Sequence, residues 1–274
     1  MIRKHPDSGL PVIDVGGVPR VLACLPPDAK PKRRQFAAFS SVAPLVPVSE
    51  WKEIDRRTRF GPDWRLDQKS HGSCTGFSAA GALMKAFGLS GAAFVKLSGS
   101  YPYSFVNGGQ DNGATIHELV DVLLTDGTCP DSLCPWDCIY ARQISQAARA
   151  AAQRYKAEEI YTVSSFAEMM SALQLGFIPV NAVQVGDNFQ NLDAVGVAGF
   201  SAGPGNHAVH ADGCKRLPDG SWALDMPNSW GLSFGVQGRC YLTQRHIEEV
   251  QQDAYVIKAA AEDPQEPNHP PSVH

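Results

Sequence analysis

The stretch that decides the interpretation of this sequence is Gln68-Lys69-Ser70-His71-Gly72-Ser73-Cys74-Thr75-Gly76-Phe77-Ser78. In it, Cys74 follows a Gly-Ser pair at a point where a helix is expected to begin. Two later segments belong with it: Gly205-Asn206-His207-Ala208-Val209 and Asn228-Ser229-Trp230-Gly231. Attack of a thiolate on a carbonyl group needs a nucleophile, a base, a group that orients the base, and a donor to the oxyanion. The three segments together contain a residue of each kind.

Each of these roles has a candidate. A thiol becomes a good nucleophile only as the thiolate, so the site must lower the pKa of Cys74. His207 could hold the proton and pair with the sulfur as an imidazolium, and the positive end of a helix starting near Cys74 would add to the effect. Asn228 would orient the imidazole, while Gln68 and the backbone N–H of Cys74 would donate to the oxyanion. Trp230 would cover the bond between His207 and Asn228 and exclude water from it.

These segments resemble the papain-like cysteine peptidases. The resemblance spans residues 60 to 258 and is carried by Gln68, Gly72-Ser73-Cys74, Phe77-Ser78, His207-Ala208-Val209, Asn228-Ser229-Trp230-Gly231, Gly235 and Gly238. His207 lies 133 positions after Cys74 and Asn228 lies 154 after it, close to the papain-type spacing of about 130–150. The resemblance implies an α+β fold with a helical lobe, a β-barrel-like lobe and an active-site cleft between them. It also implies hydrolysis of peptide bonds in a peptide or protein substrate through a thioester intermediate, with no metal or cofactor.

The sequence departs from the family pattern at four positions. His71 stands where the family usually has a cysteine, so the disulfide that anchors this loop is absent. Thr75 replaces an aromatic residue, Asn206 replaces an acidic one, and Phe234 stands where a second tryptophan is common. None of these changes removes a candidate catalytic group. We therefore expect a distant, bacterial or phage-type member.

Taken alone, each candidate has a purely structural interpretation. A cysteine is often a small buried hydrophobic residue, and Asn228 after Pro227 could be a turn residue. His207 and His210 point to opposite faces of an expected strand, so a shared metal is not expected and His210 is interpreted as structural. Only the joint pattern supports catalysis.

The resemblance also suggests residues that bind the substrate. Gly113 is the candidate for a glycine-rich loop that offers backbone groups to an extended peptide, although this segment reads equally well as a helix N-terminal turn capped by Asp111 or Asn112. Ala208 is the visible candidate for the pocket that selects a side chain. Trp230 is the third residue predicted to bind substrate.

The chain divides into four parts, which are a proline-rich N-terminal arm (1–50), a helical lobe with the nucleophile (51–150), a β-rich lobe with the histidine and asparagine (151–261), and a flexible tail (262–274). Hydrophobic periodicity predicts helices over 74–87, 115–125 and 165–175. Short apolar runs between glycine-rich turns predict strands over 178–185, 207–214, 222–226, 239–243 and 254–258. The arm could cross and block the cleft, or it could wrap the β-rich lobe and stabilise it; the wrapping interpretation is favoured.

Composition limits the partners. With 274 residues and 43% hydrophobic residues the chain can form a folded core, and its net charge of −4 does not favour nucleic-acid binding. The basic cluster Lys30, Lys32, Arg33 and Arg34 lies among prolines and is interpreted as a solvated linker.

No apolar run approaches the length of a membrane span and no signal peptide is visible, so a cytoplasmic location is expected. Cys129, Cys134 and Cys138 lack the paired spacing of a zinc site, and either reduced thiols or a local disulfide fits them.

Other functions remain open at this stage. The same Cys-before-His chemistry serves acyl-transfer enzymes and amidases, and the fold could also survive in an inactive binding or structural protein. Gln68 and Asn228-Ser229-Trp230 favour the peptidase. The sequence does not define the oligomeric state or the preferred substrate side chain.

Overall fold

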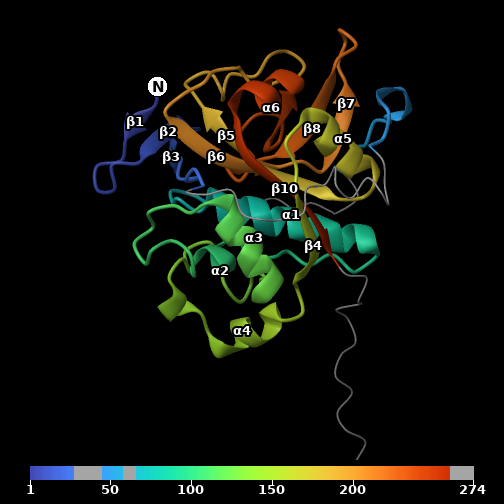
Figure 1. Ribbon diagram of the computed structural model, residues 1–274. Coiled ribbons are helices and arrows are strands. Elements are labelled where there is room, and N and C mark those ends of the chain that lie inside the picture. The colour runs from blue at the N-terminus through green and yellow to red at the C-terminus, as the bar shows by residue number, and fades with distance from the viewer. Residues whose placement is uncertain (28–44, 58–65, 260–274) are drawn as a thin grey trace, which may run out of the picture.

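The computed structural model describes residues 1–27, 45–57 and 66–259. Its helices and strands separate into two lobes that meet along α1 (Figure 1). The helical lobe contains α1 (Cys74–Ser90), α2 (Ser100–Tyr103), α3 (Ile116–Thr125) and α4 (Gln146–Ala152). The strand lobe contains β4 (Ala157–Thr162), α5 (Phe166–Gln174), β5 (Ile178–Val185), β6 (Gly205–His210), β7 (Gly213–Arg216), β8 (Trp222–Pro227), β9 (Arg239–Thr243), α6 (Gln244–Val250) and β10 (Gln251–Ala259). The predicted α+β class and two-lobed arrangement are confirmed.

Helix α1 lies between the lobes, which its sequence explains. Every residue from Cys74 to Phe87 is buried, because a helix that is largely apolar all round can be covered on all sides. The predicted helix is confirmed, and it continues to Ser90, where Gly91 ends it in the left-handed conformation (φ 95°). Its apolar neighbours from both lobes form an interlobe cluster, which includes Cys24, Cys74, Leu83, Ala114, Ile116, Leu119, Ala182, Ala208, Tyr255 and Ile257.

Helix α3 begins as predicted but is capped differently. Its N-cap is Thr115, which forms a capping box with Glu118. The expected caps Asp111 and Asn112 lie before this box. Asp111 is occupied elsewhere, because its carboxylate accepts a hydrogen bond from the backbone N–H of Gly72 (3.1 Å).

The strands form two antiparallel sheets in the strand lobe, ordered β4-β10-β5-β6 and β7-β8-β9. The single strand predicted over 207–214 is wrong, because the chain changes sheets within it. The N–H of Ala211 still donates to the carbonyl oxygen of Pro179 on β5 (2.9 Å), whereas the N–H of Asp212 donates to that of Asp225 on β8 (3.2 Å). Among the described strands the two sheets stay separate and do not close into the expected barrel.

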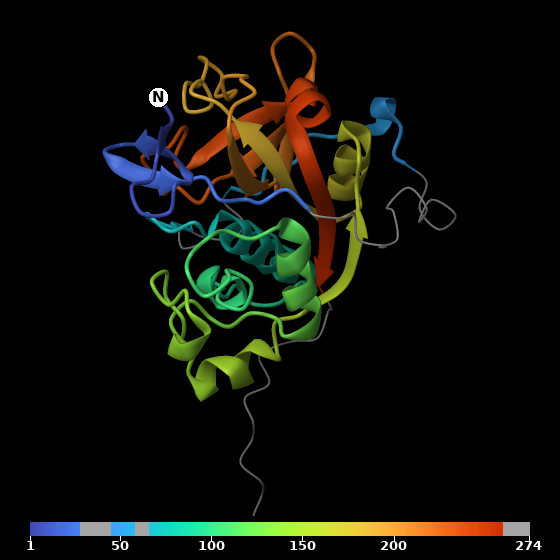
Figure 2. The same cartoon turned by 60° about the vertical axis from the view of Figure 1, so that its left-hand side comes forward.

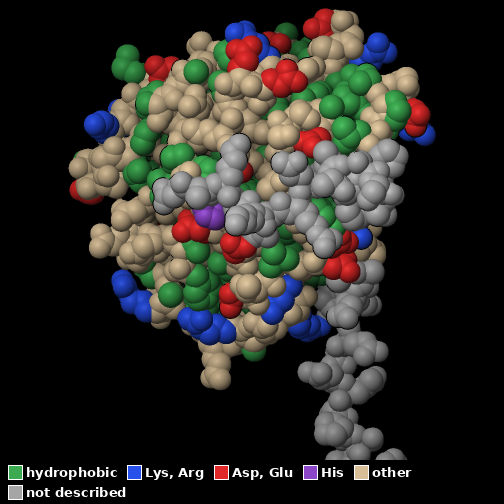
Figure 3. Space-filling view, in the orientation of Figure 1, with side chains coloured by type: hydrophobic (Ala, Val, Ile, Leu, Met, Phe, Trp, Pro, Cys, Tyr) green, Lys and Arg blue, Asp and Glu red, His purple; other side chains and the backbone are tan. Residues whose placement is uncertain are grey.

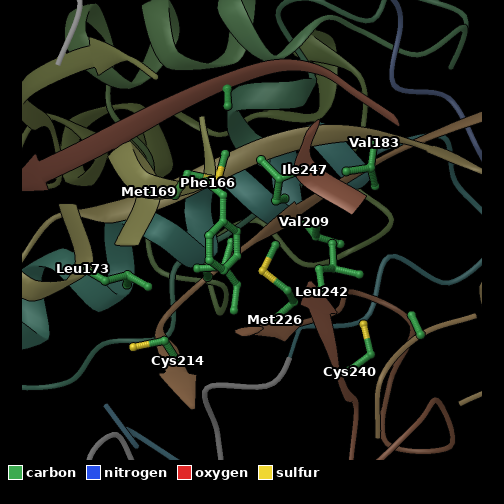
Figure 4. Packing of buried hydrophobic residues seen from close by; sticks show 14 of the residues in the cluster. Phe166, Met169, Leu173, Val183, Val209, Cys214, Met226, Cys240, Leu242 and Ile247 are labelled. Carbon is green, nitrogen blue, oxygen red and sulfur yellow. The ribbon is translucent and has the colours of Figure 1, made fainter. Parts of the chain in front are cut away.

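The core of the strand lobe lies between these sheets and the helices α5 and α6. Figure 4 shows Phe166 and Met169 of α5 pointing towards Met226 of β8 and Ile247 of α6. All four side chains are at most 3% exposed. This packing fixes β6, which carries His207, and β8, which Asn228 directly follows.

The N-terminal residues form a small sheet of their own before they reach the cleft. β1 (Arg3–Lys4), β2 (Pro11–Val15) and β3 (Val18–Val21) pair in that order, and Ile13 and Val15 are buried in the core of the strand lobe. After β3 the chain runs between the two lobes (Figure 2). The basic cluster of residues 30–34 and the tail of residues 262–274 lie outside the described residues.

Acidic and basic side chains are interspersed on the described surface of the face drawn in Figure 3. No helix in the described ranges is long and apolar enough to cross a membrane. All seven cysteines are described, and they are free thiols.

Candidate active site

Cys74 is the first residue of α1, with Ser73 as the N-cap. Its thiol lies against the backbone N–H groups of Thr75 and of Ala208, which belongs to β6 in the other lobe. The first turn of α1 fits here because residue 76 is glycine; a Cβ at Gly76 would lie 2.2 Å from the carbonyl oxygen of Gly99. The candidate nucleophile is therefore held at a helix N-terminus and at the junction of the two lobes.

His207 and Asn228 form the second part of the site. Nε2 of His207 is 2.8 Å from Oδ1 of Asn228. Because the amide oxygen can only accept, Nε2 carries the proton and Nδ1 has a lone pair. Nδ1 is buried and has no hydrogen-bond partner among the described residues. The imidazole is thus held in the tautomer that can receive a proton from a thiol.

Aromatic rings surround this imidazole. The indole of Trp230 stacks on the ring of His207 with a centroid distance of 4.4 Å, and Phe189 packs edge-on against both. Trp230 itself is fully buried. Excluding water in this way strengthens the hydrogen bond to Asn228.

Gln68 is oriented by the segment that carries the asparagine. The hydroxyl of Ser229 donates to Oε1 of Gln68 (2.6 Å), and the backbone N–H of Gln68 donates to the carbonyl oxygen of Ser229 (2.9 Å). Nε2 of Gln68 donates to the carbonyl oxygens of His71 (2.8 Å) and Val21 (3.3 Å). The side-chain amide of Gln68 is therefore fixed in place, and one of its hydrogen bonds goes to Val21 in the N-terminal residues.

The cleft is occupied by the N-terminal segment Leu22–Leu25, which we call the cleft segment. Three backbone hydrogen bonds hold it: Ala114 N–H to Ala23 O (3.2 Å), Leu25 N–H to Ala114 O (2.8 Å) and Cys24 N–H to Asn206 O (3.2 Å). The segment thus pairs with the helical lobe on one side and with β6 on the other. The backbone N–H of Ala23 also points at the thiol of Cys74.

Burial of the two groups affects the charge state of the site. Cys74 and His207 are both 0% exposed. Burial raises the pKa of the Cys74 thiol above its ordinary value, and burial lowers the pKa of His207 to about 4. The form described therefore holds a neutral thiol and a neutral imidazole. Exclusion of water from both groups removes the solvation that their charged forms would need.

The residues predicted to bind substrate have different surroundings. A Cβ at Gly113 would lie 2.2 Å from the carbonyl oxygen of Ala23, so this glycine is what lets the cleft segment approach. The backbone groups that pair with the segment belong to its neighbour Ala114. Ala208 is buried in the interlobe cluster, and Trp230 lies behind His207.

The loop before the nucleophile is anchored by a hydrogen-bonded contact between His71 and Asp111. Nδ1 of His71 is 3.0 Å from Oδ2 of Asp111. The other oxygen of Asp111 accepts from the hydroxyl of Tyr103 (2.6 Å) and from the N–H of Gly72. The ring of Trp136 lies over His71, with centroids 5.4 Å apart.

Sequence reasoning missed several residues of the site. Ser229 was inside a recognised motif, but its bond to Gln68 was not foreseen. Arg20 gave no local signal; its buried guanidinium pairs with Asp67 and donates to the carbonyl oxygen of Trp230 (2.7 Å). It ties the N-terminal sheet to the two segments that carry the candidate site.

Comparison with solved structures identifies the fold. The chain is similar to xylellain, a cysteine protease from Xylella fastidiosa (TM-score 0.69, 21% identity, covering 87% of this chain and 96% of that one). It is also similar to bromelain from Ananas comosus (TM-score 0.63, 19% identity, 78% and 100% covered). A third match is procathepsin L 3 from Tenebrio molitor (TM-score 0.65, 17% identity, 82% and 73% covered). No protein-family model and no curated protein sequence matches the chain. The chain has the papain-like fold.

Proposed function

We propose that this protein is a cysteine peptidase that uses Cys74 as nucleophile and His207 as base. The observation that carries the proposal is the meeting of the two lobes. The thiol at the start of α1 lies against the backbone of Ala208, the residue that follows His207 on β6, and the tautomer of His207 is set by Asn228. The papain-like fold supports the same assignment, since xylellain and bromelain are proteases.

The proposed reaction has two stages. The thiol of Cys74 gives its proton to Nδ1 of His207, and the thiolate attacks the carbonyl carbon of the peptide bond. The backbone N–H of Cys74 and Nε2 of Gln68 donate to the oxyanion. The C–N bond then breaks as His207 protonates the leaving amine. In the second stage His207 takes a proton from water, the hydroxide attacks the thioester, and the acid product leaves as the proton returns to the sulfur.

We also propose that the form described is latent. The cleft segment covers the thiol, and Val21 takes part of the capacity of the Gln68 amide. The N-terminal residues combine both of the roles considered for them, because the small sheet packs on the strand lobe while the cleft segment blocks the site. Activity therefore requires displacement of residues 22–25 from the cleft and of the Val21 carbonyl from the Gln68 amide.

The test is hydrolysis of a fluorogenic peptide library by the Leu22→Ala chain, in which the cleft segment opens more often and which we call the opened enzyme. Adding Cys74→Ala should abolish turnover and labelling by a peptide epoxide. The matched control is Cys240→Ala, another buried cysteine, which lies in the core of the strand lobe and should leave both unchanged. Undiminished cleavage by the Cys74→Ala chain would refute the proposal. Transfer of the acyl group to an added amine in preference to water would redirect it to acyl transfer.

A further inference from the structure

Asp111 connects the loop before the nucleophile to the loop before α3. We call residues 68–72 the oxyanion loop, because they begin with Gln68 and end two residues before the nucleophile. Oδ1 of Asp111 accepts the backbone N–H of Gly72 (3.1 Å), and Oδ2 is 3.0 Å from Nδ1 of His71. Because a carboxylate can only accept, Nδ1 of His71 is the donor. Two successive residues of the oxyanion loop are thus bonded to one side chain.

His71 in turn orients the amide of Gln68. The carbonyl oxygen of His71 accepts from Nε2 of Gln68 (2.8 Å), and the backbone N–H of His71 donates to the carbonyl oxygen of Gln68 (3.2 Å). One N–H of the side-chain amide is therefore used by His71. The other donates to the carbonyl oxygen of Val21 in the latent form (3.3 Å) and becomes free for an oxyanion when the cleft opens. The position of His71 thus sets the direction of the proposed oxyanion donor.

Tyr103 on α2 holds Asp111 from the side of the helical lobe. Its hydroxyl donates to Oδ1 of Asp111 (2.6 Å) and accepts the backbone N–H of Gly113 (3.1 Å). Burial raises the pKa of this hydroxyl and the charge of Asp111 adds to the effect, so the hydroxyl stays protonated and remains a donor. Asp111 has a left-handed backbone (φ 56°), which is uncommon for a residue other than glycine. Such a conformation persists where surrounding contacts fix it.

The two loops joined by Asp111 contact the same residue of the cleft segment. A Cβ at Gly72 would lie 2.8 Å from Cβ of Ala23, and a Cβ at Gly113 would lie 2.2 Å from the carbonyl oxygen of Ala23. Ala114, which follows Gly113, forms two backbone hydrogen bonds with the segment. A substrate chain that replaces the segment meets the same two loops. The bonds of Asp111 therefore set how the backbone of the substrate lies relative to the oxyanion donors.

We propose that Asp111 is a positioning residue of this peptidase, which holds the oxyanion loop and the loop of Gly113 at a fixed separation around the substrate. This inference rests on the proposed function and adds a residue to it. Asp111 does not touch the reacting atoms. It acts through His71 on the amide of Gln68, and through Gly72 on the start of α1.

The main experiment introduces Asp111→Ala into the opened enzyme and follows hydrolysis of an activated peptide ester. We expect kcat to fall about 10- to 100-fold, approaching the loss caused by removal of an oxyanion donor. Alkylation of Cys74 by iodoacetamide displaces iodide and forms no oxyanion, so its rate should not fall. Asp111→Asn keeps an oxygen that can accept from Gly72 and Tyr103, and should restore kcat to within about fivefold of the opened enzyme, the scale of one hydrogen bond.

A second variant tests the link to Gly113. Tyr103→Phe keeps the aromatic ring in the interlobe cluster and removes only the hydroxyl. Loss of the bond to the backbone N–H of Gly113 should raise KM about fivefold. The fall in kcat should be smaller than in Asp111→Ala, because the carboxylate still holds the oxyanion loop. If Asp111→Ala does not fold, unchanged kinetics in Tyr103→Phe overturn the inference.

The matched control is Asp131→Ala, which removes another partly buried carboxylate of the helical lobe, one that pairs with Lys96 (3.2 Å). It should leave kcat and KM unchanged. The inference is wrong if Asp111→Ala keeps its kcat, if Asp131→Ala loses as much, if Asp111→Asn does not restore turnover, or if alkylation slows as much as turnover. Each of these results leaves the peptidase in place. The proposed function fails separately, if the opened enzyme hydrolyses neither peptides nor the ester while Cys74 still reacts with iodoacetamide.

Discussion

The strength of the cleft segment can be estimated from its contacts. Three backbone hydrogen bonds to the two lobes hold it in place, and a fourth bond runs from the Gln68 amide to Val21, the residue just before the segment. At about 1 kcal/mol net for each bond, they contribute roughly 4 kcal/mol. Burial of the Leu22 side chain, which is 2% exposed, adds about 2 kcal/mol. A total of roughly 6 kcal/mol corresponds to an open fraction on the order of 1 in 10⁴.

Leu22→Ala should therefore expose Cys74. The substitution removes about 2 kcal/mol or more from the closed form and little from the open form, in which residue 22 is solvated. The open fraction should rise about 30-fold or more. The assay is the rate at which iodoacetamide alkylates Cys74 under native conditions, followed by mass spectrometry of the peptide that contains it. Peptide mapping separates this site from the other cysteines.

The control is Leu242→Ala, which truncates another fully buried leucine of the same core. It should lower the free energy of unfolding by a similar amount without matching the increase in alkylation. Equal alkylation rates in the wild-type chain and the Leu22→Ala chain would show that the segment does not govern access to the thiol. Equal acceleration by both variants would assign the exposure to global unfolding.

Three further predictions concern the groups around the site. Burial lowers the pKa of His207 to about 4 and that of His210 to about 3, so as the pH falls the unfolded chain binds protons before the folded chain does. The free energy of unfolding should therefore fall between about pH 6.5 and pH 4, by up to about 1.4 kcal/mol per pH unit for each histidine. Urea titrations at a series of pH values measure this loss. In Gly81→Ala the new Cβ would lie 2.5 Å from Cε1 of His210, which should lower the urea midpoint by an amount equivalent to about 1–3 kcal/mol. Ser229→Ala frees the Gln68 amide and should reduce kcat of the opened enzyme about tenfold with little change in KM, a smaller loss than the ~100-fold expected for removing an oxyanion donor.

Local sequence signals predicted much of the fold. The start of α1 at Cys74 follows from a cap position, and the bounds of β5 follow from an apolar run. Both signals act over a few residues. The hairpin of β2 and β3 also had a signal, Gly16-Gly17 between two valine-containing runs, which favours a tight turn. Both glycines adopt positive φ (58° and 79°). Because this hairpin was missed, residues 1–50 were predicted only as a proline-rich arm.

The occupied cleft could not be predicted in the same way. The pairing of Cys24 with Ala114 joins residues 90 positions apart, and nothing local in either segment encodes it. The pKa values of the site could not be predicted from local sequence either. A motif identifies a thiol and an imidazole, but burial sets whether they are charged, and burial here depends on a segment from the other end of the chain. The break between β6 and β7 did have a local mark, since Asp212-Gly213 is a turn dipeptide.

The central claim is that the sulfur of Cys74 carries the acyl group of the substrate. The most direct measurement is acid quenching of the opened enzyme during turnover of an activated peptide ester, followed by mass spectrometry of its peptides. We predict an acyl mass on the Cys74 peptide within the first turnover, which disappears after exhaustion of the substrate and never forms in Cys74→Ala. Full turnover with no acyl group on Cys74, or with the group on another residue, would contradict the account.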